Sequence, residues 1–400
     1  MGRKKIIIDL FAGAGGESCG IHQTFQEKDE GIRLYAVNHW DRACETHALN
    51  YPSDEVICQD IQTLIPTDLV SPKEDVELMW ASPECTSHSR AKGSKPLDDQ
   101  SRCTPFDILR WATMLRIKRI IIENVPEFTE WGPLGKDLRP IKREKGSYFA
   151  SFIQMLRGIG YDVDWRICCA ADFGAPTTRR RLFIQAVKKG SGKTIRWPMP
   201  TNSRTVEDNL LGMEMKPWIP AASIIDWSIP CTPVDDRANP LAPKTMERIL
   251  KGIARHWGSA AAPFLERYGR AVSSMKEPGQ PSPLITEFYG TGGCRSVSEP
   301  LSTISCSGAH HGLVQPLIME YYGNGGCTPV FNPLGTVTCK ERFALVTPEN
   351  CRLGFRMLQP AELAKAQSFP DWYRFTGTKT EVVKQIGNAV CPAMAKALVS

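Results

Sequence analysis

Short apolar runs recur along the first half of the chain and alternate with longer stretches in which apolar residues have helical spacing. These runs are rich in β-branched residues, which is typical of buried strands. The runs are Lys5 to Leu10, Leu34 to Val37, Val76 to Trp80, Arg119 to Glu123, and Leu182 to Val187. Their alternation with helices predicts an α/β fold with a doubly wound, mostly parallel sheet. Ligands of such sheets bind beyond the carboxyl ends of the strands.

Helices are predicted at several places along the chain, among them a helix with Ile21 and Phe25 after the first strand. Apolar residues between Cys103 and Arg116 have roughly helical spacing, so we expect a helix that covers the sheet. Pro360 is expected to open a helix that continues to Ala366, because proline is favoured in a first turn. The run from Ala389 to Leu398 predicts a last helix that packs back on the sheet.

The composition of the chain changes at about Gly190, where prolines and glycines become frequent and apolar residues no longer recur with a regular spacing. We therefore predict a catalytic domain over residues 1–189 and a smaller, irregular, β-rich lobe over 190–345. Residues 346–400 are expected to return to the first domain and complete it.

The second lobe contains an internal repeat. The segment Glu287 to Cys294 recurs 33 residues later as Glu320 to Cys327. We interpret the repeat as two duplicated β-hairpin units. Two copies are fewer than the roughly three that a self-supporting repeat fold needs, so the duplication should be local to this lobe. The matched cysteines lack the close pairs of common zinc sites, and no metal is expected.

Composition restricts the class of protein. Four hundred residues allow two or three domains, and no apolar stretch approaches the roughly 18 residues that a membrane helix needs. The 14 cysteines are spread from Cys19 to Cys391, which favours reduced thiols and a cytoplasmic protein. The formal charge of +6 permits a nucleic-acid partner without demanding one.

Chemically reactive residues follow the predicted strands. Cys85 lies in a polar loop after the run that ends at Trp80, and Glu123 ends the next run. A nucleophile and an acid are therefore expected at two neighbouring strand ends. Upstream, the first strand leads into a glycine turn, Phe11-Ala12-Gly13-Ala14-Gly15-Gly16, which lets a ligand approach backbone amides.

Taken together, these motifs resemble the cytosine-C5 DNA methyltransferases. The matches follow the family's order from residue 6 to 187 and again from 346 to 398, and they leave the middle of the chain unmatched. The resemblance implies a Rossmann-like methyltransferase domain with a target-recognition lobe. It also implies methyl transfer from S-adenosylmethionine to C5 of a cytosine that is flipped out of a specific duplex DNA sequence.

The resemblance assigns catalytic roles to four residues. Cys85 attacks C6 of cytosine, and Glu123 of the Glu-Asn-Val motif assists at N3. Arg181 holds O2, and Arg179 faces phosphate or the catalytic loop. The chain departs from the family pattern in having Glu84 between Pro83 and Cys85.

The resemblance also assigns the cofactor site. The glycine turn would hold the methionine part of S-adenosylmethionine, Trp40 would stack on adenine, and Asp60 would accept from the adenine amino group. His39 stands where the family commonly has an acid that bridges the ribose hydroxyls, and one histidine cannot accept from both. The implied cofactor set is Phe11, Gly13, Gly15, Gly16, His39, Trp40, Asp60, Ile61, Pro83 and Asn388.

Two other functions stay open from the sequence. One is a transfer-RNA cytosine-C5 methyltransferase, although the Cys-Phe-Thr string of that branch is absent here. The other is a catalytically inactive DNA-binding relative, which should have lost Cys85 or Glu123. The expected partner is double-stranded DNA, beside a separately encoded restriction endonuclease. We expect a monomer in the cytoplasm of a bacterial cell or phage-infected host.

Overall fold

The computed structural model describes residues 4–83, 104–135, 139–204, 215–257, 261–268, 284–287, 294–296, 311–314, 316–320, 326–349 and 352–400. The chain divides into two compact units. Unit 1 comprises residues 1–218 and 367–400, and unit 2 comprises residues 219–366. The chain thus leaves unit 1 and returns to it later than the predicted domain boundaries at 190 and 346.

Unit 1 is built on one large sheet, which has eight strands within the described residues. The strand order is β3-β2-β1-β4-β6-β8-β7, and β5 pairs with β4. All pairs are parallel except those of β8, which runs antiparallel to both β6 and β7. The predicted mostly parallel α/β sheet is confirmed. The strands are β1 (Lys5–Leu10), β2 (Ile32–Asn38), β3 (Glu55–Cys58), β4 (Asp75–Ala81), β5 (Arg116–Ile117), β6 (Arg119–Asn124), β7 (Tyr161–Cys169) and β8 (Arg180–Lys188).

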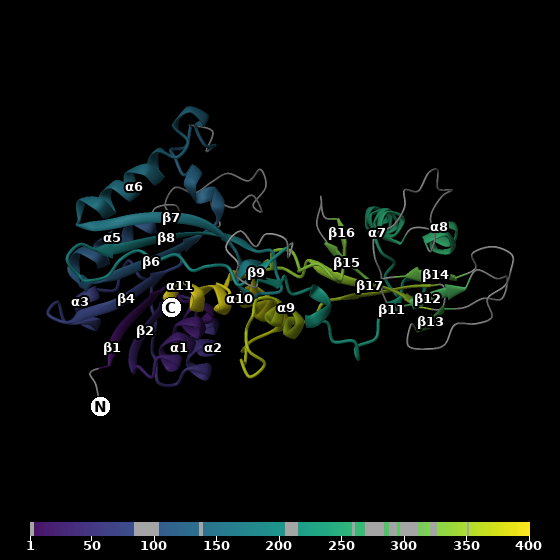
Figure 1. Ribbon diagram of the computed structural model, residues 1–400, viewed down its shortest axis with the longest axis horizontal. Coiled ribbons are helices and arrows are strands. Elements are labelled where there is room, and N and C mark those ends of the chain that lie inside the picture. Colours follow the sequence, from purple (N-terminus) through teal and green to yellow (C-terminus); the bar gives the residue numbers. More distant parts are fainter. Residues whose placement is uncertain are drawn as a thin grey trace. The chain divides into compact units, whose positions relative to one another are not determined.

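Helices cover both faces of this sheet (Figure 1). Ile120 and Ile122 of β6 pack into the core that α5 and α6 close, whereas Ile121 between them packs into the core beneath α1 and α11. This alternation is the period of two that a strand imposes on its side chains. The helices of unit 1 are α1 (Gly16–Glu27), α2 (Asp41–Asn50), α3 (Pro66–Leu69), α5 (Pro105–Met114), α6 (Ser147–Gly158), α10 (Lys379–Asn388) and α11 (Pro392–Val399).

Sequence patterns found some of these elements and missed others. The predicted helices over 103–116 and 389–398 correspond to α5 and α11. Helix α10 was not predicted, although it starts with a capping box in which Thr378 accepts from the Glu381 amide. Strand β7 was also missed, because its edge position leaves polar Asp162 and Arg166 exposed among its apolar residues.

Unit 2 contains two antiparallel sheets, ordered β11-β18-β17-β15-β16 and β13-β12-β14. The predicted helix over 360–366 is present as α9. The strands are β11 (Thr232–Pro233), β12 (Leu284–Glu287), β13 (Cys294–Ser296), β14 (His311–Val314), β15 (Leu317–Glu320), β16 (Cys327–Pro329), β17 (Phe343–Glu349) and β18 (Arg352–Met357). The helices are α7 (Pro243–His256), α8 (Ala262–Tyr268) and α9 (Pro360–Ala366).

The internal repeat governs the strand pairing of unit 2. In the first copy Leu284 of β12 faces Ser296 of β13, and 33 residues later Leu317 of β15 faces Pro329 of β16. The predicted duplicated hairpins are therefore confirmed. A third strand extends each copy, because β14 pairs with β12 as β17 pairs with β15. Each copy is thus a three-stranded antiparallel unit whose first strand lies in the middle.

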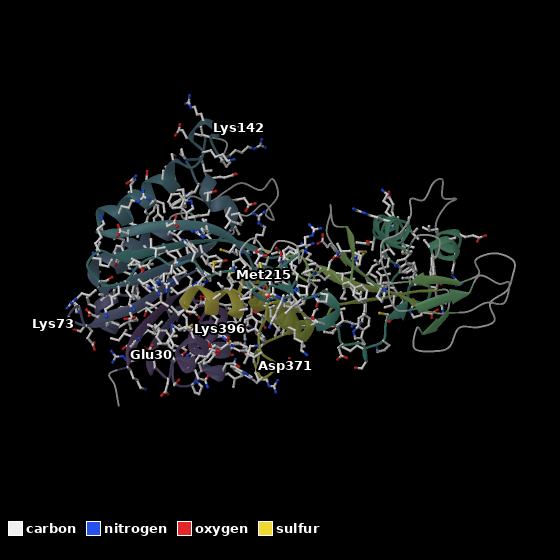
Figure 2. All side chains as sticks on the ribbon, in the orientation of Figure 1. Glu30, Lys73, Lys142, Met215, Asp371 and Lys396 are labelled. Atoms are coloured by element: carbon white, nitrogen blue, oxygen red, sulfur yellow. The ribbon has the colours of Figure 1, made fainter. Side chains whose placement is uncertain are left out.

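Charged side chains lie on the outside of unit 1. The exposed Lys73 and Lys142 point away from the sheet (Figure 2). Among the described helices, none has the length and apolar character that crossing a lipid bilayer requires.

Candidate active site

The predicted acid and the predicted arginine meet at one edge of the central sheet. Because β8 runs antiparallel to β6, its first residues lie beside the last residues of β6. Arg181 Nε is 2.9 Å from Glu123 Oε1, and the two side chains are only 15% and 9% exposed. A carboxylate that is removed from water requires a charged or hydrogen-bonding partner. The reversed strand therefore supplies a cation where the parallel strands end.

Asn124 connects this acid to the segment that leads to the predicted nucleophile. Its side chain is buried, its Oδ1 accepts from the Val125 amide, and its Nδ2 donates to the Pro83 carbonyl at 3.2 Å. The Ser82 amide in turn donates to the carbonyl of Leu10. Cys85 itself lies outside the described residues, so its distance from Glu123 stays a prediction.

The glycine turn after β1 has the backbone that the sequence predicted. Phe11, Gly13 and Gly15 all have positive φ angles, of 60°, 49° and 80°. A Cβ on Gly16 would lie 2.3 Å from the carbonyl oxygen of Val390, so no other residue fits there without movement. The predicted cofactor turn is therefore a left-handed loop pressed against the return segment of the chain.

Trp40 and His39 lie where β2 leads into α2. Trp40 is half-buried and precedes the first residue of α2, while His39 is exposed. The ammonium group of Lys384 on α10 lies 4.3 Å from the centre of the Trp40 ring. A cation at this distance from an indole is an attractive contact. One part of the Trp40 surface is thus already engaged by the protein.

Asp60 and Ile61 lie in the turn after β3. Asp60 is exposed, and its Oδ1 accepts from the Gln62 amide at 2.9 Å, so one oxygen stabilises the turn. Ile61 is buried, and its carbonyl accepts from Arg110 of α5. The Asp60 carboxylate is therefore held at the strand end where the sequence places the adenine contact.

Arg179 and Asn388 come from distant parts of the chain to the same region. Arg179 is buried just before β8, and its Nη1 donates to the carbonyl of Gly387 at 3.1 Å. Asn388, the last residue of α10, is exposed. Arg179 thus contacts the backbone that carries Asn388, and its predicted contact with phosphate or the catalytic loop stays a prediction.

A pair of buried carboxyl groups, which sequence reasoning missed, lies behind the glycine turn. Asp9 is fully buried at the end of β1, and Glu17 is 2% exposed in the first turn of α1. Ser18 donates to Asp9 Oδ2, and the Glu17 carboxyl group is in hydrogen-bond contact with Asp9. Among the described residues, Asp9 Oδ1 has no donor unless Glu17 carries a proton.

Burial controls the ionisation of this pair. It raises the pKa of Asp9 to about 8, against the opposing hydrogen bonds from Ser18 and Glu17. Burial also raises the pKa of Glu17 well above its usual range, and the charges of Asp9 and Glu123 raise it further. The sequence gives only a weak signal for this pair, an acidic residue directly after Gly15-Gly16.

A second polar cluster supports the same turn. The Nε2 atoms of His22 and His47 lie 2.8 Å and 3.1 Å from Asp54 Oδ2. The hydroxyl of buried Tyr373 donates to the carbonyl of Ala14 inside the turn. His47 and Tyr373 also crowd the position of Gly15, where a Cβ would lie 3.0 Å and 2.8 Å from them. The turn is therefore fixed by side chains from α1, α2 and the return segment.

A comparison with known families assigns the chain to the cytosine-C5 methyltransferases. The family described as C-5 cytosine-specific DNA methylase matches residues 6–218 and 316–400. The chain belongs to this family. Residues 219–315 are left unmatched, so the family match includes part of the repeat that the sequence motifs had left out.

Individual relatives are distant. The chain is 28% identical to the type II methyltransferase M.XorII of Xanthomonas oryzae pv. oryzae over 409 residues, covering 99% of this chain and 84% of the relative. It is 30% identical to the type II methyltransferase M.AquIA of a Picosynechococcus strain, covering 62% of this chain and 98% of the relative.

Solved structures share the fold. A putative DNA modification methyltransferase encoded within an Escherichia coli prophage has a TM-score of 0.54 at 19% identity and covers 99% of this chain and 97% of its own. A variant of DNMT2 from Spodoptera frugiperda also has a TM-score of 0.54, at 16% identity, and covers 99% of this chain and 100% of its own.

Proposed function

We propose that this protein is a DNA (cytosine-5-)-methyltransferase that transfers a methyl group from S-adenosylmethionine to a cytosine flipped out of duplex DNA. Its relatives are named type II methyltransferases, which supports action within a restriction-modification system beside a separately encoded endonuclease. The contact between Asn124 and Pro83 carries the proposal, because it joins the loop of Glu123 to the segment that leads to Cys85.

The residues at the sheet edge fit S-adenosylmethionine, which is a cation at its sulfur and at its amino group. A left-handed glycine turn gives access to backbone amides, and Trp40 offers an aromatic ring for adenine. The uncompensated carboxyl oxygen of Asp9 behind the turn suits a positively charged ligand. When bound, the cofactor supplies an electrophilic methyl group.

The chain's own residues activate the base. The C5 atom of cytosine is a poor nucleophile, and it gains electron density when the Cys85 thiolate bonds to C6. Glu123 then donates a proton toward N3, where the displaced charge collects. After C5 is methylated, N3 returns its proton to Glu123, the C5 proton passes to water, and the electrons of the C5–H bond restore the ring double bond as the thiolate of Cys85 leaves C6. Flipping the base costs a few kcal/mol, which contacts to phosphate and to the extrahelical base must offset.

Arg181 gives Glu123 a fixed position in this scheme. Its Nε holds one carboxylate oxygen of Glu123, and its guanidinium group has further N–H donors for a carbonyl such as cytosine O2. Unit 2 would select the target sequence by contacts to base edges, for which its glycine-rich repeats are candidates.

The covalent step provides the decisive experiment. Wild-type protein should form a stable adduct with duplex DNA containing 5-fluorocytosine, because fluorine cannot leave C5 as a proton does. Cys85→Ala should abolish both the adduct and methyl transfer while DNA binding persists. Cys58→Ala is the matched control, since Cys58 is an exposed thiol in the same unit and should leave both intact.

Two outcomes would contradict the proposal. Methyl transfer by Cys85→Ala would remove this thiol from the mechanism. Faster transfer to transfer RNA than to duplex DNA, at equal concentrations, would make the RNA methyltransferase the better assignment.

A further inference from the structure

Two buried acids flank the glycine turn in the sequence. Asp9 is the second-last residue of β1, Glu17 lies in the first turn of α1, and the Glu17 side chain is in hydrogen-bond contact with Asp9. Glu17 is also close enough to Glu123 to be influenced by its charge. Two carboxylates in contact and out of water cannot both be ionised at low cost, so one proton is retained between them.

The neighbouring charged groups do not neutralise this pair. His22 and His47 are engaged by Asp54, which itself adds negative charge near Asp9. Arg181 is engaged by Glu123.

Two further groups face the same region from other elements. Arg179 donates to the backbone of Gly387, and the neutral hydroxyl of Tyr373 donates to Ala14. The Glu17 carboxyl group also forms hydrogen bonds with its own backbone and with the backbone of Val390. Among the interactions given for Asp9 and Glu17, the charged neighbours are acids, and none is a cation.

We propose that Asp9 and Glu17 share a proton in the cofactor-free protein and release it to solvent when the cationic methyl donor binds. This inference rests on the proposed function, because it takes S-adenosylmethionine as the ligand of the glycine turn. A positive charge nearby stabilises the ionised pair, and the retained proton is then lost. Asp9 and Glu17 would thus be positioning residues that provide negative charge for the cofactor.

The sign of the pH dependence follows directly. Below the raised pKa of about 8 at Asp9, the pair is protonated, and binding must expel a proton. Affinity for S-adenosylmethionine should therefore increase with pH, by up to about ten-fold per pH unit for one proton, and level off above the raised pKa.

The test is calorimetric titration of S-adenosylmethionine into the full chain between pH 6 and pH 9, in buffers with different ionisation enthalpies. Wild type should release close to one proton at neutral pH. Glu17→Gln should bind with little proton release and a flat pH profile, because its amide can donate to Asp9 permanently. Glu27→Gln should behave as wild type, since Glu27 is an exposed residue of the same helix that pairs with Lys396.

The possible results separate this inference from the proposed function. Binding by wild type without proton release, or equal release by Glu17→Gln, overturns the shared-proton role and leaves the methyltransferase assignment intact. No binding of S-adenosylmethionine at any pH overturns both. Thermal unfolding without cofactor provides a second readout, because wild type should lose stability between pH 5 and pH 8 as the pair ionises, and Glu17→Gln should lose less.

Discussion

Two carboxyl sites in unit 1 lie close together, but one has a basic partner and the other has an acidic partner. Glu123 at the end of β6 is paired with the guanidinium group of Arg181, whereas Asp9 at the end of β1 is paired with another acid, Glu17. Both sites are largely buried. The difference is therefore in the partner, which is a cation for Glu123 and a second acid for Asp9.

We infer from this contrast that the two acid sites at the carboxyl ends of the strands have different roles. The acid on the β6 side is fixed by a cation contributed by the reversed strand β8. Asp9 and Glu17, on the β1 side, have no such cation among the interactions given for them. A positively charged ligand would balance their negative charge. Each of the following experiments changes one side of this comparison.

The largest effect is expected from Glu123→Gln. Loss of the acid should slow methyl transfer by about 10²–10⁴-fold, the usual contribution of general acid catalysis. Single-turnover methyl transfer measures it, with S-adenosylmethionine binding as the test of an intact β1 side. Glu130→Gln is the control, because Glu130 is exposed shortly after Glu123 and pairs only with Lys145 among the contacts given for it. Equal activity of wild type and Glu123→Gln would remove Glu123 from catalysis.

A third buried acid tests whether an acid–cation pair can be purely structural. In unit 2, both oxygens of Glu362 accept from Arg356 at 2.8 Å, and the amides of Asp226 and Gln359 donate to them as well. Arg356→Met should destabilise unit 2 by about 3–5 kcal/mol, because it leaves a buried charge without its partner. Hydrogen exchange of the β18 and α9 amides measures this.

The control for this experiment lies in the same strand. Arg352 pairs with Asp235 and Asp236 near the surface, so Arg352→Met should have little effect on the stability of unit 2. Similar losses in the two variants would show that burial adds nothing to the Arg356–Glu362 pair.

A smaller effect is expected where the glycine turn approaches the return segment. Gly16→Ala places a methyl group against the carbonyl of Val390, and should destabilise the protein by about 1–3 kcal/mol and weaken cofactor binding. Gly158→Ala is the matched control, because no atom lies within 4 Å of its Cβ position at the end of α6. Thermal unfolding with and without S-adenosylmethionine compares them, and equal melting temperatures would contradict the close contact.

The smallest effect is expected from adding an acid on the cofactor side. His39→Glu restores the residue type that the family commonly has, and His39 is exposed, so the change should be tolerated. Cofactor affinity should stay the same or increase, because a carboxylate accepts from both ribose hydroxyls. Titration calorimetry measures it, and a large loss of affinity would reveal a role of His39 that this assignment omits.

Local pattern was sufficient for the parts of the fold that depend on short stretches of sequence. The buried strands β1, β4 and β6 were predictable because their apolar runs are continuous, as parallel strands covered on both faces require. The family resemblance predicted Glu123 and Arg181 as site residues, but their pairing with each other was not predicted. Its physical cause, the antiparallel direction of β8, cannot be inferred from the composition of that strand.

Other features depend on contacts between distant residues. Glu17 follows the glycine turn directly in the sequence, and its contact with the backbone of Val390, which is far away in the sequence, could not be predicted from local pattern. The amide of Asn124 gave no sign by itself that it would donate to Pro83. Strand β7 was overlooked because an edge strand alternates polar and apolar residues over only part of its length.

The duplicated strands of unit 2 have a consequence for how this chain can change. The first copy ends near Pro316, and the second begins immediately afterwards at Leu317 with the same strand order. Unequal recombination between the copies would insert or delete a whole three-stranded module. A module inserted between Pro316 and Leu317 would leave the ladder between β17 and β18 intact.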